Sequence, residues 1–346
     1  MSFDEISSYS TEVLEEKAPR FNYNNEFQRL IGCRYGGTFE NLEIHANEKT
    51  NLISTYESQL SVFTRRITRK SKLIVGAFSD RGSIQSDLDI SSLLQSLLRS
   101  RKQINRKIRI EIRGWSSLNC EHEEICKRVI SRLDLSQYRN KQEYFDSLDK
   151  KRTQSAIRRG EKSNLRLCTG KEYLADYYKL YSKTCLNKGT PPHIYGYFDD
   201  MSMMFPNDFC LITCLDENSK VISGLTAFFN SHTAFYLTSA IDRDSKESSY
   251  AGVMVMWSLL NLCFERKISI LDFGRSERNS GVDRYKQQWL PTNYCGLNWV
   301  FDVSDKYIRV QVSDYGRSMK LLSHLVSKVP AKVVMGITPN LRRFVP

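Results

Sequence analysis

The second half of the chain alternates between short apolar runs and longer helical stretches. Runs composed mainly of apolar residues occupy positions 209–215, 221–229 and 234–240. Such runs are typical of buried strands, and the polar turns between them predict an antiparallel meander. A helix from position 251 and a buried strand at 268–273 follow. We therefore expect the order strand, strand, strand, helix, strand.

The flanking segments extend this order. A short strand at 165–168 and helices at 171–187 and 194–205 precede the meander, and a strand at 297–301 follows it. The tail, 313–346, is expected to be a helix followed by proline and glycine breakers. We expect this half to be a compact mixed α/β domain.

The first half carries a weaker pattern of the same kind. Apolar runs within 42–78 and clean alternation at 107–112 predict strands, and leucines spaced along 90–100 predict an amphipathic helix between them. The resulting order is β-α-β. A chain of 346 residues suits two domains better than one.

The expected division follows from these patterns and from a basic helix, 150–162, that opens the second half. We assign 1–25 to a polar leader, 26–149 to an N-terminal domain and 150–346 to a C-terminal domain. The face of the basic helix that carries its cations is either a solvated surface or a binding surface for phosphates.

Composition narrows the protein class. Apolar residues make up 40% of the chain, which is typical of a soluble globular protein. The longest apolar run, 252–264, is too short to cross a bilayer, and the N-terminus lacks the pattern of a signal peptide. Nine cysteines at irregular spacing are expected to be reduced thiols. We therefore expect a cytoplasmic protein, with a peripheral position at the inner membrane face left open.

The formal net charge of +12 indicates an anionic partner or an anionic surface. Nucleic acid, a donor substrate rich in phosphates and a membrane face each satisfy this requirement. Composition alone does not choose among them.

Charged residues gather where the strand at 268–273 ends. Asp272 and Arg275 follow the buried part of the strand, and Gly274 between them permits a tight exit. Tyr285 and Trp289 are spaced so that they share one face of a short helix. We interpret them as anchors of a helix whose Lys286 stays free to reach a cleft.

These residues also carry a family resemblance. The sequence Asp-Phe-Gly-Arg-Ser at 272–276, followed by Tyr-Lys-x-x-Trp at 285–289, resembles the C-terminal motif of the Fem-type, FemAB-like branch of the GNAT superfamily. Three further stretches agree in order, at 151–162, 187–191 and 328–339. The resemblance extends from about position 44 to the C-terminus and is strongest after Asp134.

The resemblance implies tandem GNAT-like domains of mixed α/β class, the first one degenerate, each with a mostly antiparallel sheet flanked by helices. It implies an acyltransferase that moves an acyl or aminoacyl group, from acyl-CoA or aminoacyl-tRNA, to an amine or hydroxyl of a cell-envelope or polysaccharide precursor, as in exopolysaccharide systems. No tightly bound cofactor and no DNA partner are implied.

The same resemblance suggests site residues. Asp272 is the candidate for orienting or accepting a proton, although an ion pair with Arg275 or Lys286 is an equal alternative. Lys286 is the second catalytic candidate. The candidates for holding donor or substrate lie at the strand end, in the loop before the long helix, or on the basic helix: Arg275, Ser276, Tyr285, Arg243, Ser248, Ser249, Arg158, Arg159 and Lys162.

The loop at 242–252 departs from the family pattern. In GNAT proteins that use CoA, glycines in this loop let the backbone approach a pyrophosphate, and here those glycines are absent. The departure puts a CoA donor in doubt and makes aminoacyl-tRNA more plausible. It also leaves open a second class, a basic GNAT-fold scaffold without catalysis that binds RNA or membrane phosphates.

One other cluster contains residue types that bind metals. Cys120, His122 and Cys126 supply three zinc ligands, but a fourth does not follow at a natural spacing. We therefore predict no metal.

Overall fold

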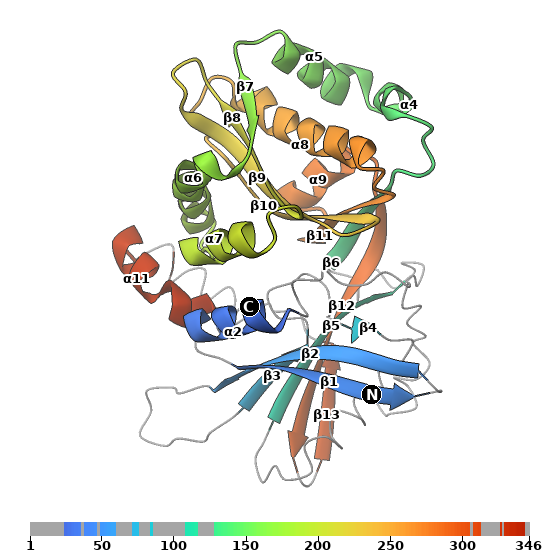
Figure 1. Ribbon diagram of the computed structural model, residues 1–346, viewed down its shortest axis with the longest axis vertical. Coiled ribbons are helices and arrows are strands. Elements are labelled where there is room, and N and C mark those ends of the chain that lie inside the picture. Colours follow the sequence, from blue (N-terminus) through green and yellow to red (C-terminus); the bar gives the residue numbers. More distant parts are fainter. Residues whose placement is uncertain are drawn as a thin grey trace. The chain divides into compact units, whose positions relative to one another are not determined.

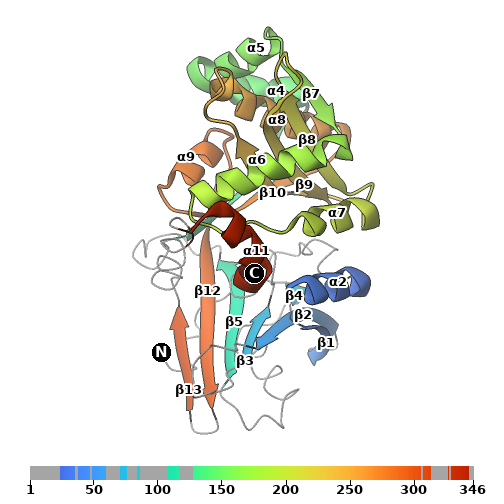
Figure 2. The same ribbon diagram turned by 90° about the vertical axis from the view of Figure 1, so that its left-hand side faces the viewer.

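The structure is a computed structural model that describes residues 24–35, 38–46, 49–59, 71–75, 84–85, 108–116, 128–304, 307–312, 326 and 329–342. It divides into two units (Figures 1 and 2). Unit 1 comprises Met1–Val129, Tyr294–Gly316 and Arg343–Pro346. Unit 2 comprises Ile130–Asn293 and Arg317–Arg342.

Unit 1 contains a mixed sheet and the helix α2 (Asn25–Tyr35). The sheet order is β1-β2-β3-β5-β12, with β13 paired to β12 and β4 paired to β2. Only the β3–β5 pair among these is parallel. The strands are β1 (Thr38–Ala46), β2 (Lys49–Gln59), β3 (Ser71–Val75), β4 (Ile84–Gln85), β5 (Ile108–Ser116), β12 (Thr292–Ser304) and β13 (Tyr307–Val312).

Unit 2 is built on the strand order β6-β11-β10-β9-β8-β7. The meander β8-β9-β10 is antiparallel, whereas β10 and β11 are parallel. The strands are β6 (Arg128–Asp134), β7 (Arg166–Thr169), β8 (Phe209–Leu215), β9 (Val221–Phe229), β10 (Thr233–Ile241) and β11 (Ile270–Glu277). Every residue of β8 and β9 is buried, because helices cover both faces of the sheet.

Those helices are of unequal character. The long helix α8 is apolar over most of its length and packs with β8, β9 and α5 in one core. Helices α6 and α7 lie on the opposite face (Figures 1 and 2). The helices of unit 2 are α4 (Lys141–Ser147), η2 (Lys150–Gln154), α5 (Ser155–Glu161), η3 (Lys171–Tyr173), α6 (Leu174–Asn187), α7 (Tyr195–Met204), α8 (Ser248–Glu265), α9 (Gly281–Gln287) and α11 (Ala331–Arg342).

The predicted fold class is confirmed: the protein is mixed α/β, with mostly antiparallel sheets flanked by helices. The meander and the strand that enters the 272–276 motif lie within a few residues of their expected bounds. The division into units differs from the predicted one at position 149. Unit 2 begins at Ile130, and most of β12 pairs with β5 and is grouped with unit 1, because pairing across a sheet joins segments distant in sequence.

Two local expectations also change. The basic segment at 150–162 is a π-helical turn, η2, followed by α5, and its inner face is buried through Thr153, Gln154, Ala156 and Ile157. The tail helix α11 includes Gly336 and Pro339, which we expected to follow a helix.

Other expectations lie outside the described residues. These are the polar leader up to position 23, the helix at 90–100 and the cluster of Cys120, His122 and Cys126. Among the described residues, no helix combines the length and apolar character needed to span a bilayer. The described part of the chain also contains no group of three metal-ligating side chains.

Candidate functional site

The site begins where two parallel strands separate. β10 and β11 pair at only three positions, from Thr233↔Ile270 to Phe235↔Asp272. Both strands then continue, β10 to Ile241 and β11 to Glu277, without further pairing to each other in this fully described part of the chain. A bulge between Tyr236 and Thr238 accompanies the separation. Ligands of open sheets bind beyond the carboxyl ends of parallel strands, so this opening is the natural site.

Aromatic rings border the opening on both strands. The rings of Tyr236 on β10 and Phe273 on β11 have centroids 6.3 Å apart. The Tyr236 hydroxyl donates a hydrogen bond to the Ser239 hydroxyl. Burial raises the pKa of Tyr236 to about 12, so the phenol stays neutral at physiological pH and can act as a donor.

The strand β11 turns sharply at Gly274, which has a φ of 67°. This left-handed conformation favours glycine, because other residues are strained there. The Gly274 amide donates to Asp272 Oδ1 over 2.7 Å. Asp272 is only 2% exposed, so its carboxylate fixes the backbone at the strand end.

Lys286 secures the other side of the same turn. Its Nζ donates to the carbonyl oxygens of Gly274 and Arg275, each over 2.9 Å, and its side chain is 2% exposed. The expectation that Lys286 stays free to reach a cleft is therefore wrong. A short helix directly after the strand brings the ammonium back onto the strand's own carbonyls.

Asp272 has a cationic neighbour that the sequence did not indicate. Arg132 of β6 is buried, and its Nε lies 3.9 Å from Asp272 Oδ2. The sequence indicated Arg275 or Lys286 as the alternative ion-pair partner of Asp272. The only signal in the sequence was an arginine inside the apolar run of β6, and pairing of β6 beside β11 places it there.

The neighbouring candidates differ in accessibility. Arg275 is partly exposed, whereas Ser276 is buried and its Oγ has no hydrogen-bond partner within the described residues. The Tyr285 hydroxyl donates to the Gly252 carbonyl over 3.1 Å, which ties α9 to the first turns of α8. Burial raises the pKa of Tyr285 far above its usual value. Trp289 is fully buried, as expected of an anchor.

The loop between β10 and α8 is held by ion pairs. Asp242 is 7% exposed and accepts a 2.7 Å hydrogen bond from Lys220, while Lys183 lies 3.2 Å from Asp244. Arg243 and Ser249 are exposed and Ser248 opens α8. The N-terminus of a helix favours an anion. At α8 the acidic residue Glu247 already occupies the N-cap position.

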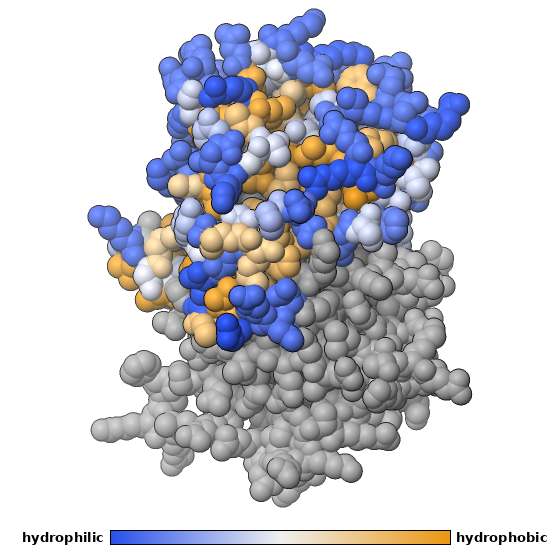
Figure 3. All heavy atoms as spheres, viewed as in Figure 1, coloured by the Kyte–Doolittle hydropathy of each residue, from blue (hydrophilic) through white to orange (hydrophobic). Residues whose placement is uncertain are grey.

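Arg158 and Arg159 on α5 and Lys162 at its C-cap are all exposed, and hydrophilic residues cover this part of unit 2 in Figure 3. Arg158 donates to Gln154 over 3.1 Å and lies over the Phe145 ring, whereas Arg159 and Lys162 point outward from the buried face of α5. None of the three lines a pocket that α9 contributes to.

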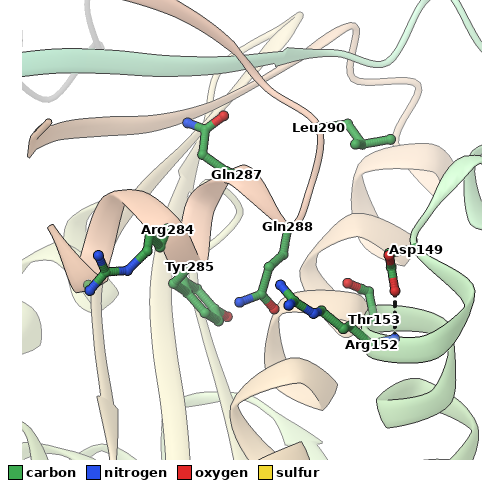
Figure 4. A pocket seen from close by; sticks show the side chains of 9 residues that line it. Asp149, Arg152, Thr153, Arg284, Tyr285, Gln287, Gln288 and Leu290 are labelled. Carbon is green, nitrogen blue, oxygen red and sulfur yellow. Dashed lines mark hydrogen bonds between the residues drawn. The ribbon is translucent and has the colours of Figure 1, made fainter. Parts of the chain in front are cut away.

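That pocket has a volume of about 630 Å³ and lies between η2 and α9 (Figure 4). Tyr285 is the predicted site residue that lines it. Sequence reasoning did not select Arg152 or Arg284, which also line it. The structure thus gathers Asp272 and Lys286 around Gly274 and places Tyr285 at a separate pocket.

Comparison with protein families matches part of the chain. A model described as the acetyltransferase (GNAT) domain matches residues 149–287, which include the separated strands, α8 and α9. This segment is a GNAT domain. No curated protein sequence matches the chain.

Several solved structures have a fold similar to this chain, and the similarity extends over both of its units. The crystal structure of FemX has a TM-score of 0.60 at 10% identity, over 85% of this chain and 94% of FemX. A conserved protein of unknown function from Bacteroides thetaiotaomicron has a TM-score of 0.52 at 10% identity, over 85% of this chain and 95% of its own.

A third similar structure is the C-terminal domain of a putative lysylphosphatidylglycerol synthetase from Agrobacterium fabrum. Its TM-score is 0.51 at 10% identity, over 94% of this chain and 97% of its own. Identities this low establish a shared fold. Together with the GNAT domain, this shared fold supports the resemblance to the FemAB-like branch that the motifs indicated.

Proposed function

We propose that the protein is an acyltransferase that moves an acyl or aminoacyl group to an amine or hydroxyl of a cell-envelope or polysaccharide precursor. The observation that carries the proposal is the separation of β10 and β11 inside a GNAT domain, beside the first turn of α8. A donor seated there has its reacting carbonyl within reach of main-chain N–H groups on the separated strand edges. Such groups stabilise a developing oxyanion.

Asp272 and Lys286 serve this site by positioning. Asp272 fixes the Gly274 amide and Lys286 fixes the Gly274 and Arg275 carbonyls, so together they determine where the end of β11 lies. Positioning of reacting groups accounts for a large share of catalysis in transfer reactions, because a bimolecular step becomes effectively unimolecular. Arg275 and Ser276, carried on this fixed turn, are the groups proposed to meet the substrate.

The donor is proposed to be acyl-CoA or aminoacyl-tRNA. Arg243, Ser248 and Ser249 are the proposed contacts for its phosphates at the loop before α8. A net charge of +12 supports a polyanionic donor of either kind. The similarity to FemX and to a putative lysylphosphatidylglycerol synthetase domain supports an envelope-related acceptor and an aminoacyl donor.

A transfer assay tests the proposal. The purified protein is incubated with acetyl-CoA or with charged tRNA and a panel of amine and hydroxyl acceptors, and products are followed by mass spectrometry. Ser239 is exposed on β10 beyond the bulge, so Ser239→Trp is expected to fill the opening. We expect a loss of turnover of at least about 100-fold from the misplaced donor.

Ser231→Trp is the matched control, because Ser231 is exposed in the turn between β9 and β10. It should leave turnover unchanged. Equal activity of both variants and the wild type would place the reaction elsewhere in the chain.

A scaffold without catalysis is the second candidate. The loop before α8 favours it. There Asp242 pairs with Lys220 and Asp244 pairs with Lys183, so fewer cations remain for a donor. The scaffold would bind RNA or anionic vesicles with strong salt dependence and show no transfer with any donor. Product formation that Ser239→Trp abolishes excludes it.

A further inference from the structure

The pocket between η2 and α9 has no role in the transfer step proposed above, although the inference drawn from it rests on that proposed function. Its lining combines cations, an amide and an aromatic ring from segments more than 120 positions apart in the sequence. All its lining residues belong to unit 2. It is therefore a feature of one compact body.

Two guanidinium groups give the pocket its charge. Arg152 and Arg284 are both exposed, and Figure 4 shows them on either side of Tyr285 and Gln288. Arg284 uses Nη1 to donate to the Asn279 carbonyl over 3.1 Å, which holds its side chain while other guanidinium N–H groups remain. Guanidinium groups suit phosphate, because they donate two parallel hydrogen bonds.

The carboxylate in the pocket does not cancel this charge. Asp149 accepts a 2.7 Å hydrogen bond from the Arg152 amide, drawn as the dashed line in Figure 4. It therefore acts as the N-cap of η2. With two guanidinium groups and one carboxylate, the lining has a formal charge of +1.

The region between the arginines suits a flat, polar ring. The Tyr285 hydroxyl is fixed by the Gly252 carbonyl, so the ring presents a rigid surface. Gln288 is partly exposed and offers both a donor and an acceptor, as the edge of a nucleobase requires. Thr153 is 1% exposed, lines the pocket, and its Oγ1 has no hydrogen-bond partner among the described residues.

We infer that this pocket binds one nucleotide with phosphates on both sides of its ribose. The base stacks on Tyr285 and is read by Gln288, and the phosphates on its two sides pair with Arg152 and Arg284. Base–aromatic stacking combined with flanking cations is a general means of holding a single nucleotide.

Both proposed donors contain this unit. The adenosine of coenzyme A carries a 3′-phosphate and a 5′-diphosphate, and each internal nucleotide of tRNA carries phosphates on both sides. The pocket thus gives the donor a second attachment, remote from its reacting carbonyl. Binding energy from such remote parts of a substrate can be used to position the reacting group.

Calorimetric titration of the full chain with adenosine 3′,5′-bisphosphate tests the inference. Arg152→Gln and Arg284→Gln should each weaken binding about tenfold, which corresponds to ~1.4 kcal/mol. Arg139→Gln is the matched control, because the Arg139 side chain is 87% exposed and lies outside the pocket. Tyr285→Phe, which keeps the ring, should retain affinity, and Gln288→Ala should reduce it.

Competition identifies the source of the nucleotide. Displacement of the probe by coenzyme A but not by a short RNA ending in CCA assigns a CoA donor, and the reverse assigns tRNA. Absence of binding, or equal affinity of the Arg152, Arg284 and Arg139 variants at unchanged melting temperature, overturns the inference. If transfer persists in that case, the proposed function is retained and only the nucleotide pocket is rejected. Nucleotide binding as expected without transfer to any acceptor would instead remove the proposed function.

Discussion

The ammonium nitrogen of Lys286 lies 2.9 Å from the carbonyl oxygen of Gly274, and both groups are buried. The same nitrogen holds the next carbonyl, of Arg275, and the Gly274 amide is held by Asp272. The Lys286 ammonium from α9 and the Asp272 carboxylate from β11 thus hydrogen-bond to the peptide groups on either side of Gly274, which has a left-handed conformation. This arrangement makes the geometry of the strand end depend on side chains that do not face solvent.

Lys286→Met should therefore destabilise the fold as well as impair transfer. Removing the ammonium leaves the buried Gly274 carbonyl and the partly buried Arg275 carbonyl without this donor. Hydrogen bonds to charged groups contribute about 1.5–3 kcal/mol each. We expect the free energy of unfolding to fall by about 3 kcal/mol in urea titrations. Turnover should fall by roughly 100–1,000-fold, the scale for losing one preorganised group.

The control for this change is Lys171→Met, because Lys171 is exposed at the start of η3. A Lys286→Met protein with wild-type stability would show that the two carbonyls find other donors. It would then leave Lys286 without the positioning role assigned to it.

Acid stability should depend on Asp242. The hydrogen bond from Lys220 holds the pKa of the Asp242 carboxyl below its usual value. A carboxyl whose pKa is lowered on folding contributes stability above its unfolded pKa, near 4, and loses that contribution as pH falls through the lowered value. Asp242→Asn should cost about 1 kcal/mol at pH 7 and progressively less as the pH falls through that lowered value.

Asp242→Asn should also weaken the dependence of stability on pH in the alkaline range. The Asp242 carboxylate raises the pKa of Lys220, so this contribution is present below the unfolded lysine value and is lost as pH rises through the raised one. Melting temperatures measured across pH 2–11 report both the acidic and the alkaline dependence of stability. Asp176→Asn, in an exposed pair with Lys179, is the comparison that should change neither.

Gly224 is a position where β9 cannot accept a side chain. A Cβ added there would lie 2.6 Å from the Tyr177 ring and 3.1 Å from the Ile212 carbonyl oxygen. Tyr177 is fully buried and its hydroxyl pairs with Thr238 over 2.7 Å, so the ring has no room to move. We expect Gly224→Ala to lower the free energy of unfolding by about 2 kcal/mol.

Gly281→Ala provides the contrast, since a Cβ at Gly281 meets no atom within 4 Å. It should be neutral or stabilise α9 by up to ~1 kcal/mol through helix propensity. Equal effects of the two substitutions in chemical denaturation would contradict the packing argument.

Arg159 and Lys162 are predicted to bind phosphate backbone. Replacing both with glutamate should weaken binding of RNA or CoA and reduce the slope of log affinity against log salt, because fewer counterions are released. Lys171→Glu with Lys188→Glu changes the net charge equally at exposed positions that flank α6. If both double variants lower the slope to the same extent, the α5 cations act only through net charge.

The sequence by itself determined the order of elements in unit 2 and the resemblance to GNAT proteins. Runs such as 209–215 and 221–229 consist mainly of apolar residues, as a strand covered on both faces requires, and this pattern is local. The motif around Gly274 was equally visible in the sequence. It consists of a glycine near the end of a buried strand and a short helix with aromatic residues, and all of it lies within about twenty residues.

Only the tertiary structure decided what those motif residues do. Lys286 looked mobile in sequence, since a lysine between aromatic anchors carries no sign of where its ammonium lies. Its burial follows from how α9 folds back over β11. Arg132 was not selected, because it is about 140 positions before Asp272 and reaches it only through strand order. The pairing of Arg152 with Arg284 around one pocket is likewise a property of packing, which sequence spacing cannot express.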